Sequence, residues 1–312
     1  MRKSVNQRRA LWKGLAFVSP WLLGFLLFTA YPIVASFYYS LCYYDGISRP
    51  HWIGLENYER LLQDPLFWKS LGNTLYFVAL WIPLGLGFCL LAAVLLNQGV
   101  RGQSVFRALF YIPSITPLVA ASVLWMWLLH PTYGLVNDLL RGPLDALNAW
   151  AASLGLSWRV GLPGWLSDPQ WAKPALVLMS VWGMGNTILI FLAGLQEVPR
   201  SLYESAAIDG AGPLARFRYI TLPMLSPVIF FNVVIGLIAG FQVFTQAYVM
   251  TRGGPSDATL FYAYYLFNNA FIFFNMGYAS AMAWLLFVLV VACTWLVFKT
   301  SARWVYYAGE GT

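Results

Sequence analysis

The stretch from Tyr219 to Thr251 reads YITLPMLSPVIFFNVVIGLIAGFQVFTQAYVMT and contains no charged residue over 33 positions. A helix needs about 20 mostly apolar residues to cross the hydrocarbon core of a bilayer, so this run predicts one complete crossing. The amides within it, Gln242 and Gln246, are neutral and four residues apart, which places them on one helix face. A soluble domain would interrupt such a run with charges, so the run indicates a membrane protein.

Other charge-free runs lie on both sides of this stretch, and each is long enough for one crossing. They cover 14–44, 70–100, 108–137, 174–196 and 258–298. We expect six transmembrane helices, at about 15–41, 73–96, 109–129, 174–195, 224–250 and 276–298. The fold class is therefore all-α and polytopic.

Two shorter segments predict helices that do not cross. The run 146–158 is too brief to span and predicts an interfacial helix, whereas the spacing of Leu55, Tyr58, Leu61 and Leu62 suits an amphipathic surface helix. Residues 258–275 are rich in Tyr and Asn, so this part of the last run is interpreted as an outer-surface or re-entrant segment.

The composition supports a chain surrounded by lipid. Of 312 residues, 60% are hydrophobic and only 10% are charged, whereas a soluble domain carries about 25% charged residues. The net charge of +7 does not indicate nucleic-acid binding, because Lys and Arg lie at the edges of apolar runs. We expect one transmembrane domain, 14–307, between a basic tail, 1–13, and a second tail, 308–312.

The basic residues orient the chain. With six crossings, one side holds 12 of them and the other holds 7. The basic-rich side carries Arg2, Lys3, Arg8, Arg9, Lys13, Arg101, Arg107, Arg200, Arg216, Arg218, Lys299 and Arg303. The positive-inside rule then places both termini and the loop 196–223 in the cytoplasm, and the loops 42–69, 130–172 and 251–275 outside. The first apolar run is too long for a cleaved signal peptide.

Catalysis and self-powered transport are both disfavoured. The two histidines, His51 and His130, fall on the outer side, and no catalytic set or metal site can be assembled in one layer. No lysine follows a glycine, so there is no P-loop for ATP. The helix centres lack the charged groups of proton-coupled carriers. A carrier or channel acting alone and a membrane enzyme for lipids or glycans are the competing hypotheses.

The loop 196–223 reads QEVPRSLYESAAIDGAGPLARFRYITLP and predicts two short helices joined by a tight corner. Ser201 can cap the first helix, with Glu204 three residues later in a capping-box arrangement. The small residues 205–207 give that helix a narrow face that another surface can approach closely. The loop is longer than a simple connector between two helices needs to be, and its helix and turn signals predict an ordered structure.

The corner itself is marked by glycine and proline. Gly210 suits a left-handed helix stop and Gly212 relieves the turn. Pro213 is well placed to start the second helix, and Pro223 is expected to end it just before the next crossing.

This loop resembles the EAA loop of binding-protein-dependent ABC importers. That motif is Glu-Ala-Ala, three residues, Gly, nine residues, Ile, any residue and Leu-Pro. Here Glu204 begins the motif, Gly210 follows at the expected distance, and nine residues lead to Ile220 and then to Pro223. The one departure is Ser205 in place of the first alanine, and it is similarly small.

Other segments extend the resemblance to the sugar-permease branch, which includes maltose, lactose and glycerol-3-phosphate importers. They are GLENY at 54–58, FRALFYIP at 106–113, TRGGP at 251–255 and NAFIFFNMGYASA at 269–281. The resemblance implies a type I importer permease in a bacterial or archaeal cytoplasmic membrane. It also implies a second related permease, two ATPase subunits that bind ATP and Mg, an extracytoplasmic binding protein and a carbohydrate substrate, with no cofactor in this chain.

The resemblance assigns roles to particular residues. Contact with the ATPase is expected from Glu204, Ser205, Ala206, Ala207, Asp209, Gly210, Arg216, Ile220, Leu222 and Pro223. The substrate pathway is expected to include Trp182, Asn186, Gly240, Gln242 and Gln246, because amides and an aromatic plate suit a hydroxyl-rich ligand. The glycines could equally pack helices and the glutamines bridge them. The sequence leaves the particular sugar or polyol open, and also which of the two permeases holds it.

Overall fold

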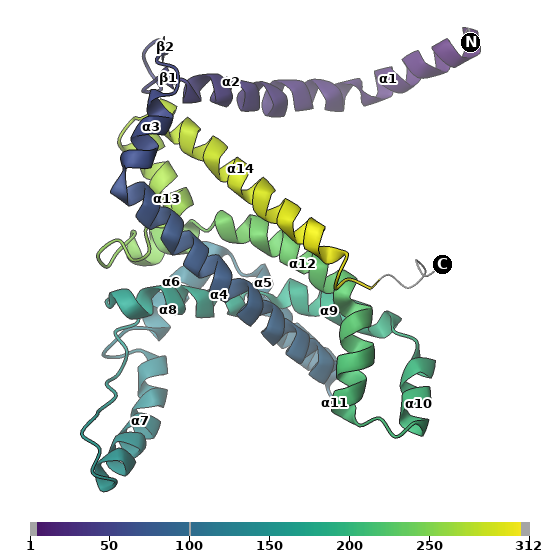
Figure 1. Cartoon of the computed structure of the whole chain (residues 1–312), viewed down its shortest axis with the longest axis vertical. Coiled ribbons are helices and arrows are strands. Elements are labelled where there is room, and N and C mark those ends of the chain that lie inside the picture. The colour runs from purple at the N-terminus through teal and green to yellow at the C-terminus, as the bar shows by residue number, and fades with distance from the viewer. Residues whose placement is uncertain (1–4, 100, 307–312) are drawn as a thin grey trace. The chain divides into compact units, whose positions relative to one another are not determined.

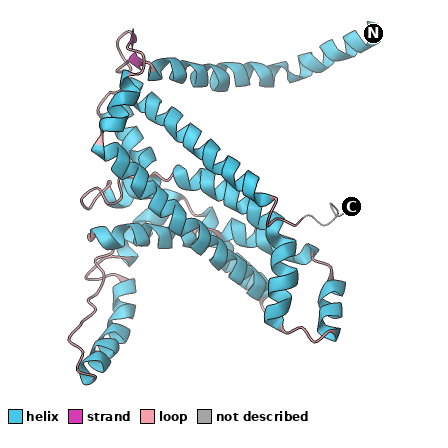
Figure 2. Cartoon of the chain, in the orientation of Figure 1, coloured by secondary structure: helices cyan, strands magenta, loops and turns pink. Residues whose placement is uncertain are grey.

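The computed structural model describes residues 5–99 and 101–306 and divides them into two compact units, which are treated separately below. Helices form most of the described chain, and strands occur in it only as one short hairpin (Figures 1 and 2). The expected all-α class is therefore confirmed. Arg2, Lys3 and the tail 308–312 lie outside the described residues.

The first unit, formed by residues up to Asp64 and by 266–287, starts with a long helical stretch. It consists of α1 (Val5–Phe25), a π turn, η1 (Leu26–Ala30), and α2 (Tyr31–Ser40). The helix begins before the expected Leu15, because no glycine or proline interrupts residues 5–13. Trp12–Ser40 is a candidate membrane span of 29 residues, with side chains such as Phe28 exposed.

A hairpin and a short helix follow in this unit. β1 (Cys42–Tyr43) pairs antiparallel with β2 (His51–Trp52), with Cys42 opposite Trp52. The expected amphipathic helix is confirmed as α3 (Glu56–Gln63). Buried Asn57 donates from Nδ2 to the carbonyls of Ser40 at 3.0 Å and Cys42 at 2.9 Å, which satisfies acceptors left at the end of α2.

The second unit, residues 65–265 and 288 onward, has its core where three helices pack. They are α4 (Pro65–Leu96), α9 (Gly185–Glu197) and α12 (Leu222–Phe241). Buried side chains at the centre are Leu86, Cys89, Ala92, Ala93, Leu96, Ile188, Phe191, Leu192, Leu195 and Leu225. α4 starts earlier than the expected Asn73. The charged Lys69 ended the apolar run without ending the helix, since a long side chain near a helix end can keep its ammonium in a polar layer.

Two expected single crossings are bent pairs of helices. α5 (Gln103–Ile115) and α6 (Leu118–Leu128) meet at 103°, and α8 (Pro169–Trp182) meets α9 at 50°. The expected helix to Met250 also ends early, since α12 stops at Phe241 and a π turn, η3 (Ala247–Thr251), follows a break. Hydropathy does not register these breaks, because the intervening residues are uncharged.

Four described helices are long and apolar enough to cross a membrane, or six if each bent pair counts as one span. The remaining elements are α7 (Leu135–Ser153), α10 (Arg200–Ile208), α11 (Pro213–Arg216), η2 (Phe217–Thr221), α13 (Tyr262–Phe267), η4 (Asn268–Ile272) and α14 (Met276–Ser301). The helix expected at 146–158 is wrong in extent. α7 begins at Leu135 because an exposed helix tolerates the charges of Asp138 and Arg141.

Candidate functional site

The three helix breaks of the second unit line one cavity of about 360 Å³. The break between α5 and α6 contributes Thr116, and the break between α8 and α9 contributes Gly183 and Met184. The segment after α12 contributes residues 242–246. Segments far apart in the sequence therefore converge on one cavity.

Local sequence explains two of the breaks. Pro117 forces Thr116 into an extended conformation, with φ −72° and ψ 129°, which no helix can continue. Gly183 is the C-cap of α8, and glycine favours a helix end because it loses more conformational freedom within a helix than other residues do. Helix ends leave backbone N–H and C=O groups without intrahelical partners, so breaks supply polar groups where an unbroken apolar helix would not.

Aromatic rings form much of the cavity wall. Phe77 and Trp81 of α4 stack with centroids 5.8 Å apart, and Trp182 meets Trp125 edge-on at 5.9 Å. Nε1 of Trp81 is buried without a hydrogen-bond partner among the described residues. A flat aromatic wall suits the faces of a sugar ring.

The polar groups of the cavity are neutral. Gln246 donates from Nε2 to Oγ of Ser180 at 3.2 Å, and Gln242 is exposed beside it. Ser114 and Thr245 add hydroxyls, and none of the residues that line the cavity is charged. The cavity therefore fits a polar, uncharged ligand better than an ion. Within the described ranges no cluster of three His, Cys, Asp or Glu side chains could hold a metal.

The structure brings together only part of the expected substrate pathway. Trp182, Gln242 and Gln246 line the cavity, although the helix is broken between the two glutamines. Asn186 is exposed on α9 and does not line it. Gly240 instead packs against α4, where an added Cβ would lie 2.9 Å from Val78 Cγ2.

Sequence reasoning missed several lining residues: Trp81, Ser114, Thr116, Ser180 and Thr245. The sequence did contain a signal for the lining residues at the break between α5 and α6. Pro113 and Pro117 lie four residues apart in an apolar run, a pattern that interrupts a helix. The sequence contained no local signal for Trp81, because α4 is unbroken and only packing against other helices determines which of its faces lines the cavity.

The second candidate site is the corner between α10 and α11. Gly210 adopts φ +77°, as expected for a left-handed stop. The N–H of Ala211 bonds to the carbonyl of Ala206 at 2.8 Å and that of Gly210 to Ala207 at 3.2 Å, which is a Schellman motif. Arg216 donates from Nε to the carbonyl of Ala211 at 2.9 Å and braces the corner.

Two local expectations at this corner are wrong. No side chain caps α10, whose N-cap is Pro199, so Ser201 and Glu204 lie within the helix and form no capping box. Pro223 does not end the second helix, because Pro213–Phe241 is one continuous span. The π turn η2 precedes Pro223 and shifts the hydrogen-bond ladder, and the N–H of Leu222 bonds to Phe217.

The corner exposes apolar side chains. Ile208 is 87% exposed, Leu214 79% and Tyr219 74%. Glu204, Ser205, Ala207, Asp209 and Gly210 are also exposed, whereas Ala206, Arg216, Ile220, Leu222 and Pro223 are partly covered. Large apolar groups rimmed by polar ones are typical of a surface that another protein covers.

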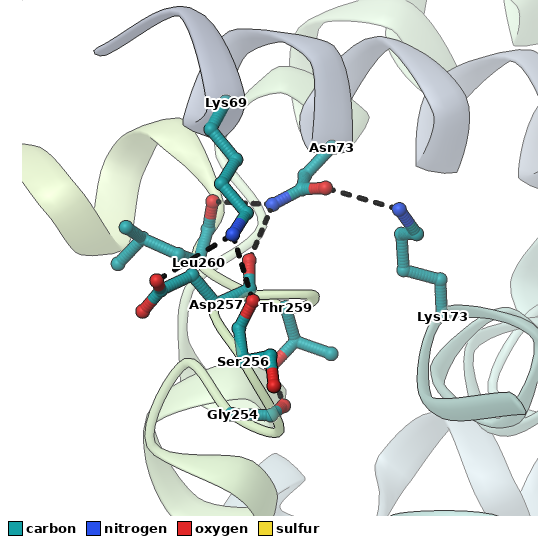
Figure 3. Close-up of polar contacts among 8 residues, drawn as sticks. All are labelled: Lys69, Asn73, Lys173, Gly254, Ser256, Asp257, Thr259 and Leu260. Carbon is teal, nitrogen blue, oxygen red and sulfur yellow. Dashed lines mark hydrogen bonds and ion pairs between the residues drawn. The ribbon is translucent and has the colours of Figure 1, made fainter. Parts of the chain in front are cut away.

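A polar cluster holds the loop that follows η3 (Figure 3). Asn73 of α4 donates to the carbonyls of Asp257 at 2.8 Å and Leu260 at 3.1 Å, and its Oδ1 accepts from Lys173 of α8 at 3.0 Å. Lys69 donates to the Ser256 carbonyl at 2.8 Å and lies 3.5 Å from the Asp257 carboxylate. This loop is thereby joined to α4 and α8, which also contribute side chains to the cavity.

Comparison with known proteins places these features in a family. Residues 85–307 match the family described as "Binding-protein-dependent transport system inner membrane component". The chain is 42% identical over 314 residues to the "Probable ABC transporter permease protein YesP" of Bacillus subtilis (strain 168), covering 99% of this chain and 97% of that protein. It is 36% identical to the "Sulfoquinovosyl glycerol transport system permease protein SmoG" of Agrobacterium fabrum (strain C58 / ATCC 33970), covering 86% and 83%.

A solved structure has the same fold. One chain in the crystal structure of a bacterial alginate ABC transporter, in complex with an alginate pentasaccharide-bound periplasmic protein, superposes with a TM-score of 0.77 at 22% identity. The similarity covers 95% of this chain and 96% of that one.

Proposed function

Since this chain belongs to the family of binding-protein-dependent transport system inner membrane components, we propose that it passes a sugar or sugar-like solute across the membrane, driven by ATPase subunits that dock on the corner between α10 and α11. The observation that carries the proposal is the cavity at the three helix breaks. It combines aromatic walls with neutral hydroxyls and amides, and no charged residue lines it.

The nature of the solute is supported by chemistry and by relatives. Hydroxyl-rich ligands bind where a few polar groups are set among aromatic rings, and Trp81, Trp182 and Gln242 supply both kinds of group. SmoG, at 36% identity, is named for sulfoquinovosyl glycerol transport, and this solute contains a sugar ring. A disaccharide, an oligosaccharide and a polyol all fit this uncharged lining, whereas the anionic glycerol-3-phosphate fits it less well.

Partners follow from the same proposal. A second, related permease would complete the pathway, two ATPases would bind ATP and Mg, and a soluble binding protein would deliver the solute. The exposed apolar side chains Ile208 and Leu214 suit a docked protein. The distribution of Lys and Arg supports cytoplasmic termini and also supports a corner that faces the same side as the ATPase.

Reconstitution tests the transport role. The chain is placed in liposomes with its sister permease, ATPase and binding protein, and uptake of labelled sugars is measured with and without ATP. We expect uptake only from the complete, ATP-supplied assembly. Uptake by the purified chain alone would contradict the proposal. A thermal-shift screen of the binding protein against sugars and polyols identifies the solute to be used.

A charge reversal tests the docking role. Glu204→Lys changes an exposed carboxylate in α10, and Glu59→Lys makes the same change at an exposed position of α3. The first variant should lose most ATPase that co-purifies with the chain, and the second should keep it. Equal co-purification in both variants would remove the corner from its proposed role.

A further inference from the structure

A second cavity, of about 430 Å³, lies beside α10 and has no part in the proposed sugar pathway. Its lining comes from the loop after α4, from α5, from the end of α9 and from the first turn of α10. Polar side chains predominate: Asn97, Gln103, Arg107, Gln196, Arg200 and Tyr203. The cavity thus lies against the helix that leads into the Schellman corner.

This cavity is cationic and contains no compensating acid. Arg107 and Arg200 both line it, and none of its lining residues is Asp or Glu. Neither arginine forms an ion pair with a described carboxylate. Two guanidinium groups that share a cavity repel each other, so an anion between them would be stabilised.

One arginine atom shows directly that a partner is lacking. Nε of Arg107 is buried and has no hydrogen-bond acceptor among the described residues. A buried donor without an acceptor costs about 1–3 kcal/mol, and more when it carries charge. A bound anion in the cavity would neutralise this guanidinium, whose charge no described carboxylate offsets.

The start of α10 adds to the positive potential. Arg200 is its first residue, the N-cap is Pro199, and no side chain accepts from the free N–H groups of the first turn. The N-terminus of a helix carries a partial positive charge and favours an anion. Two arginines and an uncapped helix start therefore face the same space.

We propose that this cavity binds a phosphate group, carried either by a lipid headgroup or by a free phosphate ester. Phosphate offers several acceptor oxygens and up to two negative charges, which match two guanidinium forks. The cavity also has the buried apolar side chains Leu195 and Val198 on one side, so the phosphate can enter with part of its attached group. Since Tyr203 of α10 lines the cavity and bonds to Thr221 of η2 at 2.9 Å, an occupant would brace both helices of the corner.

Binding measurements on the full chain test this inference without any transport. Inorganic phosphate is titrated into the chain in phosphatidylcholine nanodiscs. In parallel, native mass spectrometry compares retention of phosphatidylglycerol and phosphatidylcholine by the detergent-purified chain. The test variant is R107Q/R200Q. The control is R101Q/R218Q, which removes the same charge from two exposed arginines outside the cavity.

We expect the test variant to bind phosphate or retain phosphatidylglycerol at least about tenfold more weakly, and the control to stay within about twofold of the wild type. Binding of phosphatidylglycerol alone identifies a lipid headgroup, and binding of inorganic phosphate alone identifies a free phosphate. R107K, which keeps the charge but loses the planar fork, should be intermediate and well folded by size-exclusion chromatography.

Three results would overturn the inference. In the first, neither probe binds the wild type. In the second, both double variants lose binding equally, which would indicate general charge attraction instead of a specific site. In the third, R107Q/R200Q binds both probes normally but retains less ATPase when that subunit is co-purified, which would assign the arginines to a carboxylate of that partner. None of these results bears on the sugar proposal, so the two can fail separately.

Discussion

Gln246, in the segment that follows α12, donates a hydrogen bond from Nε2 to Oγ of Ser180 on α8 across 3.2 Å. Ser180 in turn donates to the carbonyl of Leu176 at 2.8 Å, so its hydroxyl is oriented to accept from the glutamine. This bond connects two of the three broken segments at the wall of the cavity. Segments that neither hydropathy nor periodicity relates are therefore joined at the proposed solute site.

Removal of this bond should weaken transport more than it weakens the fold. Gln246→Leu and Ser180→Ala should each lower uptake several-fold, since a neutral hydrogen bond contributes about 0.5–1.5 kcal/mol. The double variant should be no worse than the poorer single one, because both remove the same interaction. Uptake in proteoliposomes is measured for the wild type, the two single variants and the double variant, which completes the double-mutant cycle. Gln98→Leu, at an exposed position, is the control. Fully additive losses would show that the two side chains act independently.

Gly240 should be intolerant of any side chain. An alanine Cβ there would lie 2.9 Å from Val78 Cγ2 and 3.3 Å from the ring of Trp81. Overpacking of this kind costs about 1–3 kcal/mol. Gly236→Ala is the matched control one turn away, since its nearest neighbour would be Ile82 at 3.6 Å. Thermal unfolding in detergent should separate the variants, and similar midpoints would contradict close packing of α4 and α12.

Gly210 should matter through backbone conformation alone. No atom lies within 4 Å of an added Cβ, but φ is +77°, where L-residues are strained by about 1–2 kcal/mol. Gly210→Ala should loosen the Schellman corner and reduce the ATPase that co-purifies. Gly212→Ala, at φ −69°, should leave it near the wild-type level. If both substitutions reduce the co-purified ATPase equally, the left-handed conformation of Gly210 is not what ATPase binding requires.

Asn73 should hold the loop after η3 far more firmly than the ion pair does. Asn73 is buried and contacts Asp257, Leu260 and Lys173, so Asn73→Ala leaves several polar groups unpaired (Figure 3). The expected cost is about 1–3 kcal/mol. Asp257→Asn removes only the charge of an exposed pair, for which about 0–1 kcal/mol is typical, and asparagine tolerates the left-handed φ of +58° at this position. Hydrogen exchange of residues 253–260 should rise strongly in the first variant and little in the second, and the reverse order would contradict this ranking.

Much of the architecture could be predicted because it depends on local sequence. A charge-free run of membrane length predicts a crossing wherever it packs, as the candidate spans Trp12–Ser40 and Met276–Ser301 illustrate. Likewise Gly210 and Pro213 shape the corner through their own backbone preferences. The capping box failed because the helix could start at Arg200, directly after Pro199, one residue before Ser201.

The sequence by itself determined the membrane character, the approximate spans and the corner between α10 and α11, since each depends on hydrophobic length or on the conformational preference of a few adjacent residues. Only the tertiary structure decided which broken helices share a cavity. It placed Trp81 and Ser180 beside Gln242 and turned Gly240 into a packing contact. It also brought Arg107 and Arg200, far apart in the chain, to one unneutralised cavity. These juxtapositions depend on side-chain packing between α4, α8, α9 and α12, which no local pattern specifies.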